Sequence, residues 1–389
     1  MDNPIARRAL LRSAYIGAFT YLAPSFGQNL PAQPLAPVPE TGLIIREKEP
    51  ENLESPASVL HTFITPTSQF YIRNHFKQPT VTLNTWALKV DGAVGRPLEI
   101  GYRDLVGMSS RTQVSMLECA GNGRVFLIPK ENGAQWQSGG MGNAEWTGVP
   151  LSVILEKAGL KSNAVDVMFE GADQGQIKED PKSPGEIHFA RSLPVAKARD
   201  GDVLLAYKMN GADLSPAHGF PVRLIVPGWY GMASVKWLAR VVVTDKPFDG
   251  FFQTLQYSHW ERPNGTPTLL PVTEMHVKSS IISPMLDEVV ARNTIYKVHG
   301  LAWAGESGIA QVEVSTDGGQ NWSNALLTGP TARYAWRQWE YDWQPPAPGQ
   351  YTLMARATDT RGRIQPMERD KDRRSYEITH VLPIKVEVR

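Results

Sequence analysis

The sequence predicts an α+β protein in which a mixed α/β domain is followed by a β-sandwich of immunoglobulin type. The chain has 389 residues, which exceeds the usual size of one hydrophobic core and favours two domains. Helix and strand patterns alternate in its middle, whereas only strand patterns follow the stretch 262–275, RPNGTPTLLPVTEM. We therefore expect an N-terminal segment at 1–50, a mixed domain at 51–262 and a sandwich at 263–389.

The N-terminal segment predicts an export signal followed by an extended arm. Arg7 and Arg8 precede two leucines, Arg12 and the mainly apolar stretch 13–24, which is the order of a twin-arginine export signal. A short basic amphipathic start is the alternative, because no A-x-A cleavage site follows. Five prolines in 24–41 block helix and donate nothing to a sheet. A periplasmic location is favoured, with a cytoplasmic one as the alternative.

The mixed domain shows both helical and strand periodicity. Residues 85–100 (TWALKVDGAVGRPLEI) have strand-like alternation around a turn expected at Asp91-Gly92. Apolar residues in 151–160 recur at helical spacing. The stretch 234–245 (SVKWLARVVVTD) alternates well enough to predict a strand.

The last third of the chain predicts a sandwich of short strands. Asp317-Gly318-Gly319 has the composition of a hairpin turn. Short strands at regular spacing with turn signals between them are typical of immunoglobulin-type sandwiches. The expected strands lie within 294–304, 309–322, 336–343 and 351–362.

Composition excludes several classes of function. The formal net charge is +1, which gives no support for a nucleic-acid binder. A single cysteine excludes an intramolecular disulfide, a Cys-x-x-Cys-His haem attachment and every multi-cysteine zinc or iron–sulfur site. No uninterrupted apolar stretch of about 18 residues or more occurs, so no ordinary membrane span is expected.

That cysteine, Cys119, stands in the stretch LECAGNGR and allows three interpretations. It is a buried structural thiol, a nucleophile without a recognisable protease flank, or a single thiolate ligand to a metal that other groups also hold. A metal whose remaining sulfur ligands come from a cofactor needs only one cysteine from the protein. Spacing alone does not choose among these three.

Basic residues stand on otherwise apolar stretches elsewhere in the mixed domain. Arg73 and His75 are two residues apart in FYIRNHF, so a strand would place both on one face. His218 and Arg223 flank the Phe-Pro of HGFPVR, and Lys236 lies in SVKWL. Such charges are costly to bury unless an anion or a carboxylate meets them. The pattern indicates a local site for an anion.

These motifs together resemble the sulfite oxidase family of molybdenum enzymes in its haem-free bacterial form. The resemblance runs from about Pro66 to the C-terminus. The motifs that carry it recur in order: FYIRNHF, LECAGNGR, WTGVPL, FEGAD, VLLAYKMNG, HGFPVR, VPGWYG, SVKWL and VEVSTDGGQNW.

The resemblance implies a sulfite-oxidase-type molybdopterin domain, an Ig-like dimerisation domain and one molybdenum atom held by a pyranopterin dithiolene and Cys119. The glycines after Cys119 would let the backbone pass close to the metal. The residues that match catalytic or substrate-pocket positions of the family are Arg73, Arg124, Trp136, Tyr257 and Arg333, with Arg337 as the alternative to Arg333. The residues that match cofactor-binding positions are His75, Asp173, His218, Arg223, Ser234 and Lys236. A lysine often found before the pocket tryptophan is replaced by Asn132, which bears on substrate preference.

The implied activity is oxidation of sulfite to sulfate by oxygen-atom transfer, with arginines binding the anion. No haem segment is recognisable, so we expect the electrons to pass to a separate cytochrome c. A homodimer is expected from the second domain. The alternatives on the same fold are a sulfane dehydrogenase acting on carrier-bound sulfur and a nitrate reductase. A non-catalytic scaffold is disfavoured, because Cys119, Arg73 and Tyr257 are all present.

Overall fold

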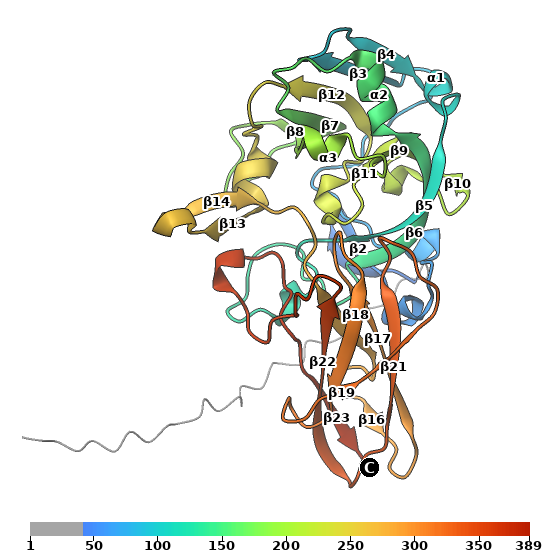
Figure 1. The fold of residues 1–389 in the computed structure, drawn as a ribbon, viewed down its shortest axis with the longest axis vertical. Coiled ribbons are helices and arrows are strands. Elements are labelled where there is room, and N and C mark those ends of the chain that lie inside the picture. Colours follow the sequence, from blue (N-terminus) through green and yellow to red (C-terminus); the bar gives the residue numbers. More distant parts are fainter. Residues whose placement is uncertain (1–41) are drawn as a thin grey trace, which may run out of the picture. The chain divides into compact units, whose positions relative to one another are not determined.

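The computed structural model describes residues 42–389 (Figure 1). The expected export signal and nearly all of the proline-rich arm therefore lie outside the described residues. The α+β prediction is confirmed. The described chain first forms two sheets accompanied by short α-helices, and then continues with strands and no further α-helix. A two-stranded ribbon opens the described part, formed by β1 (Ile44–Lys48) and β2 (Glu51–Glu54).

The first sheet of the mixed domain carries the LECAGNGR motif at the end of one strand. Its order is β10-β9-β6-β5, with β11 also paired to β9. β5 runs antiparallel to β6, and Glu118 at its end lies opposite Met141. The strands are β5 (Arg111–Glu118), β6 (Met141–Pro150), β9 (Leu204–Met209), β10 (Ala212–Asp213) and β11 (Arg223–Ile225).

The second sheet has the order β4-β3-β12-β7-β8. β12 pairs parallel to β3 and antiparallel to β7, so it lies at the centre of the sheet. The strands are β3 (Ala87–Gly92), β4 (Leu98–Gly101), β7 (Asp166–Gly175), β8 (Ile187–Pro194) and β12 (Leu238–Thr244). The α-helices are α1 (Tyr102–Val106), α2 (Leu151–Ala158) and α3 (Val195–Ala198).

Local expectations for this domain are met with one shift. The helix expected at 151–160 is α2, which buries Leu151, Ile154 and Leu155. The turn expected at Asp91-Gly92 lies just after these residues, because both still pair with β12. Gly92 has φ of +90°, and a Cβ there would meet a carbonyl oxygen of β12 at 2.1 Å. Gly92 is therefore needed for the close contact between β3 and β12, and not for the turn itself.

The C-terminal strands form two sheets with a shared apolar core, as the sequence predicts. Figure 1 shows them in orange and red. One sheet has the order β15-β17-β21-β20, from β15 (Lys278–Ser283), β17 (Tyr296–Trp303), β20 (Leu326–Thr328) and β21 (Arg337–Trp343). The other has the order β16-β23-β22-β18-β19, from β16 (Val289–Val290), β18 (Ile309–Ser315), β19 (Ser323–Asn324), β22 (Gly349–Asp359) and β23 (Ile384–Val388).

The connection between the two groups of sheets contains the last elements that position the site. A π-helical turn, η6 (Phe252–Gln256), precedes a hairpin of β13 (Ser258–Glu261) and β14 (Thr268–Pro271). One apolar cluster joins residues of the mixed domain to Trp303 and Trp336 of the C-terminal part, so the two share core packing. Within residues 42–389, no helix is both long enough and apolar enough to cross a membrane.

Candidate active site

A cavity that is partly open to solvent lies in the mixed domain and collects residues that are distant in sequence. It is lined from the first sheet by Cys119, from β7 by Asp173 and from the segment after η6 by Tyr257. Of the residues expected to act on substrate, Arg73 and Tyr257 line it. All six residues expected to bind the cofactor also line it: His75, Asp173, His218, Arg223, Ser234 and Lys236.

Cys119 follows directly on β5, and its thiol is buried. The Cys119 amide donates to Gly140 O at 2.8 Å, and its carbonyl accepts from the amide of Asn122 at 2.8 Å. At Gly121, in the bend that follows, a Cβ would lie 2.2 Å from the guanidinium of Arg124, so a larger residue would displace that side chain. The expectation that the glycines after Cys119 let the backbone pass close to a metal stays a prediction.

A buried ion pair supports the Cys119 loop from the C-terminal part of the chain. The Glu118 carboxylate accepts from Lys278 Nζ at 3.0 Å and from Trp303 Nε1 at 2.8 Å. The side chains of Glu118 and Lys278 are 2% and 3% exposed. Asn122 adds a third hydrogen bond to this carboxylate, at 3.1 Å. The residue next to the thiol is thereby fixed by groups from two parts of the fold.

Three cations line the cavity: Arg223 is buried, and Arg73 and Lys236 are partly buried. Arg73 Nη1 donates to Asn52 Oδ1 at 3.3 Å, Arg223 donates to two main-chain carbonyls at 3.1 Å, and Lys236 Nζ donates to Ala217 O at 2.9 Å. Within residues 42–389 none of the three cations forms an ion pair. An unpaired buried cation is unfavourable, so this arrangement suits an anionic ligand.

Burial and the cations together shift the pKa values of the titratable groups. Burial lowers the pKa of Arg223 to about 10, and burial with the charge of Arg223 lowers that of Lys236 well below its ordinary value. Burial, with both of these charges, lowers the pKa of His218 to about 3. Burial raises the pKa of Asp173, although Lys236 opposes the shift. His218 is therefore neutral at pH 7.

Tyr257 and His75 form a hydrogen-bonded pair at the cavity. The tyrosine hydroxyl lies 2.6 Å from His75 Nε2. Burial raises the pKa of Tyr257, with Arg73 opposing the shift, and burial with the charge of Arg73 lowers the pKa of His75 well below its ordinary value. Both groups are thus neutral at pH 7. His75, expected to bind the pterin, thus lines the cavity and contacts Tyr257.

Three of the expected substrate-pocket residues do not line the cavity. Arg124 donates to Ala134 O at 2.8 Å and to Ser375 O at 3.1 Å. Trp136 is fully buried and packs edge-on against Tyr71. Arg333 is on the surface.

The Arg333 side chain is 70% exposed and pairs with Asp202 at 2.9 Å. Arg337, its alternative, is the first residue of β21 and also does not line the cavity. The expectation that either arginine reaches the pocket is therefore not met. Both arginines lie in the C-terminal part of the chain. No sequence motif there indicates which side chain points toward the mixed domain.

A segment that no motif predicted, residues 369–377, reaches the site from the C-terminal part. Tyr376 stacks against Tyr257 with ring centroids 4.8 Å apart, and its ring faces the guanidinium of Arg124 at 5.3 Å. The Glu377 amide donates to Ala120 O at 2.7 Å, next to Cys119. The segment therefore contacts both the thiol loop and the tyrosine.

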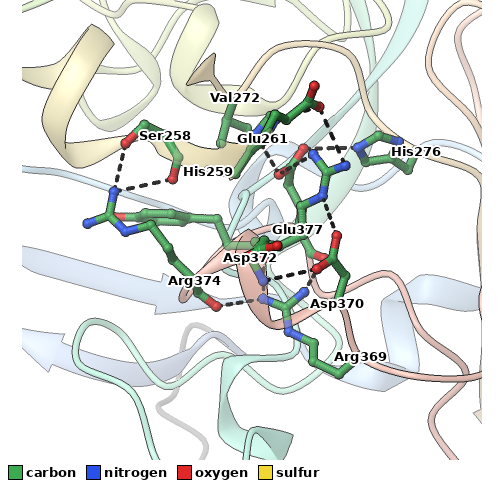
Figure 2. A network of polar contacts seen from close by, with 12 residues as sticks. Ser258, His259, Glu261, Val272, His276, Arg369, Asp370, Asp372, Arg374 and Glu377 are labelled. Atoms are coloured by element: carbon green, nitrogen blue, oxygen red, sulfur yellow. Dashed lines mark hydrogen bonds and ion pairs between the residues drawn. The ribbon is translucent and has the colours of Figure 1, made fainter. Parts of the chain in front are cut away.

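Polar contacts hold this segment in place (Figure 2). The buried Glu377 carboxylate lies 3.0 Å from His276 Nε2 and 3.1 Å from His259 Nδ1. Arg374 donates to Ser258 Oγ at 2.7 Å, and thereby binds the residue after Tyr257. Burial raises the pKa of Glu377, but the two histidines outweigh this effect and bring it to about 2.

The chemistry of the cavity fits a molybdenum–pterin cofactor. Cys119 offers one soft thiolate, and no group of three or more His, Cys, Asp and Glu within residues 42–389 could hold a metal unaided. Asp173 Oδ1 and Arg223 Nε are buried without a hydrogen-bond partner in the described part of the chain. An acceptor and a donor of this kind suit a pterin ring, and the cations suit its phosphate.

Comparisons with known proteins agree with the fold. A model of the oxidoreductase molybdopterin binding domain matches residues 75–252, and a model of the Mo-co oxidoreductase dimerisation domain matches 270–377. The sulfite oxidase of Gallus gallus is 33% identical over 345 residues, covering 84% of this chain and 73% of that protein. The mitochondrial sulfite oxidase of Mus musculus is 33% identical over 357 residues, covering 85% of this chain and 62% of the relative, or about three fifths of its length.

Two further relatives extend the comparison. Nitrate reductase (NADH) 2 of Arabidopsis thaliana is 33% identical over 312 residues, covering 72% of this chain and 33% of that protein. The crystal structure of the sulfane dehydrogenase SoxCD from Paracoccus pantotrophus aligns with a TM-score of 0.74 and 28% identity, covering 96% of this chain and 93% of that one. Fold and cavity together define a molybdenum-cofactor oxidoreductase. The chain belongs to the sulfite oxidase family.

Proposed function

We propose that the protein is a sulfite dehydrogenase, which converts sulfite and water to sulfate, two protons and two electrons. The observation that carries the proposal is that one cavity brings together a thiol, an arginine without an ion-pair partner and a tyrosine–histidine pair. These are Cys119, Arg73, Tyr257 and His75. When bound, the molybdenum cofactor supplies the oxygen-atom transfer and takes up the two electrons.

The residues of this chain bind and orient the substrate. Arg73 contributes a positive charge that is not neutralised by a carboxylate, which favours a small oxyanion. Its hydrogen bond to Asn52 Oδ1 helps to fix its direction. The Tyr257 hydroxyl, held by His75, offers a neutral hydrogen-bond partner to a substrate oxygen. The partial burial of Arg73 and His75 and the burial of Tyr257 strengthen these interactions.

A sulfane dehydrogenase acting on carrier-bound sulfur is the second candidate. Two observations favour it: the similarity in fold to SoxCD, and the presence of Arg73 at the cavity without Arg124 or Arg333. A pocket with fewer arginines discriminates less strongly for a free dianion. Nitrate reduction is supported by sequence similarity alone.

One experiment separates these activities. The purified protein is analysed for molybdenum and assayed with sulfite, with thiosulfate on a carrier peptide and with nitrate, using ferricyanide or added cytochrome c for the first two and a reduced viologen dye for nitrate. The proposal predicts about one molybdenum per chain and a kcat/KM for sulfite in the ordinary enzymatic range of about 10⁴ M⁻¹s⁻¹ or more. Turnover of the carrier-bound sulfur alone, or of nitrate alone, would replace the sulfite assignment.

The proposal includes a separate electron acceptor. We infer that a cytochrome c receives the electrons through a transient contact, of the kind that buries below about 1,200 Å² in redox encounters. The purified chain is expected to show no Soret band and to react poorly with oxygen. A stoichiometric haem in the purified protein, or efficient turnover with oxygen alone, would contradict this part.

Assembly and location complete the proposal. The match of residues 270–377 to a dimerisation domain supports a homodimer, which light scattering of the purified protein can test. Arg7 and Arg8 support export to the periplasm. Replacing both arginines by lysine should leave the protein in the cytoplasm, as measured by cell fractionation. Unchanged periplasmic recovery would contradict the twin-arginine assignment.

A further inference from the structure

Strand β8 supports both partners of the tyrosine–histidine pair. Phe189 and Arg191 are two residues apart in β8 and both are buried, so they lie on one face of the strand. The Phe189 ring stacks on the His75 ring with centroids 4.3 Å apart. Arg191 reaches the backbone on both sides of Tyr257.

The guanidinium of Arg191 joins two carbonyls that flank the tyrosine. Nη1 donates to Phe252 O, in the π-helical turn η6 just before Tyr257. Nη2 donates to Val272 O at 2.7 Å, and the amide of Val272 in turn donates to Tyr257 O at 2.9 Å. The charged group also lies 5.9 Å from the centroid of the Tyr257 ring. Arg191 therefore connects the turn before Tyr257 to Val272, which follows β14 and is itself hydrogen-bonded to Tyr257.

No ion pair explains why an arginine occupies this position. Arg191 is 1% exposed, and within residues 42–389 it has no carboxylate partner. Burial lowers its pKa to about 10, with Tyr257 opposing the shift. A buried cation without a counter-charge is costly. Arginine suits this position because its planar guanidinium donates to two carbonyls at once, whereas lysine presents a single point of donation.

We propose that Arg191 is a positioning residue for Tyr257: it fixes the backbone around the tyrosine so that the hydroxyl meets His75 Nε2. The inference rests on the proposed catalytic role of Tyr257. In this proposal β8 supports the hydrogen-bonded pair. Phe189 packs against His75, and Arg191 holds the backbone around Tyr257.

A double-mutant cycle tests whether Arg191 acts through the tyrosine hydroxyl. Arg191→Met should lower kcat/KM by about tenfold or more, since losing hydrogen bonds from a charged group costs this much. In the Tyr257→Phe background the same change should lower kcat/KM by less than about threefold, because the contact it maintains is already absent. Equal effects in both backgrounds would overturn the proposal.

A second readout does not depend on turnover. 3-Fluorotyrosine placed at position 257 should give a ¹⁹F resonance that shifts or broadens in Arg191→Met, in full-length protein with or without cofactor. Arg191→Lys should give an intermediate change, and it replaces the methionine variant if that one fails to fold. Arg356→Met is the matched control, because Arg356 also faces an aromatic ring but lies in β22. An unchanged resonance in both Arg191 variants would overturn the proposal even if sulfite proves not to be the substrate.

Discussion

At the scale of single residues, Cys119 is the side chain that we propose as the protein's ligand to molybdenum. Cys119→Ser keeps the size of the side chain but replaces a soft thiolate by a hard oxygen. We expect the variant to fold and its sulfite turnover to fall by about 100-fold or more. Loss of a residue that only supports a metal ligand already costs up to about 100-fold at a metal site. Molybdenum content and steady-state turnover measure the two effects. Near wild-type turnover with molybdenum still bound would contradict the ligand assignment.

Arg73 is the cation expected to face the substrate. Arg73→Gln removes a positive charge while keeping a hydrogen-bonding side chain, so the KM for sulfite should rise by about tenfold or more. Raised ionic strength should weaken sulfite binding more in the wild type than in the variant. Arg240→Gln is the control, because Arg240 is exposed and pairs with Asp91. An unchanged KM would place Arg73 away from the substrate.

How far the sequence predicted the site depends on where each residue lies relative to a motif. Arg73 and Lys236 lie within short motifs, and both line the cavity although neither lies in a strand. Arg124 also lies in a motif, but its guanidinium packs over Gly121 and donates to Ser375 O, and it does not line the cavity. That outcome depends on Ser375, a partner that no local pattern identifies.

At the scale of elements, segment 369–377 depends on an ionised carboxylate. The pKa of Glu377 is about 2 in the fold against an ordinary value of 4.5, so the unfolded chain binds the proton more tightly. The resulting stability, about 3 kcal/mol by linkage, is present above pH 4.5 and is lost as the pH falls from 4.5 towards 2.

Glu377→Gln should remove this pH dependence. The difference in the free energy of unfolding between the wild type and the variant should shrink as the pH is lowered from 6 to 3.5. Urea unfolding at both pH values measures it, with Glu156→Gln as a control at an exposed position of α2. A constant difference across this range would show that the His259–Glu377–His276 contacts do not depress the carboxylate.

Element boundaries were predictable where periodicity was local. Helix α2 follows from its apolar spacing, and β12 from its alternation. Segment 369–377 could not be predicted in the same way, because its main-chain position depends on contacts with β13 and the Cys119 loop. Long-range polar contacts of this kind leave no periodic pattern in the chain.

At the scale of the whole molecule, the Glu118–Lys278 pair joins the two parts of the fold. Lys278→Met should lower the free energy of unfolding by about 3–5 kcal/mol, because it leaves a buried carboxylate without its counter-charge. The double variant Lys278→Met with Glu118→Gln should recover part of the loss, since the amide is neutral and still accepts from Trp303. Urea unfolding of the three proteins measures this. A single variant as stable as the wild type would contradict the prediction.

The contacts between the Cys119 loop and the C-terminal part also set an order of events during biosynthesis. Ala120 O is bound by the amide of Glu377, and the Glu118 carboxylate by Lys278. Both partners leave the ribosome long after Cys119 itself. A nascent chain halted before them lacks the groups that fix the residues on each side of the thiol. We therefore expect capture of the cofactor to follow translation, and chains truncated before Lys278 to fail to retain it.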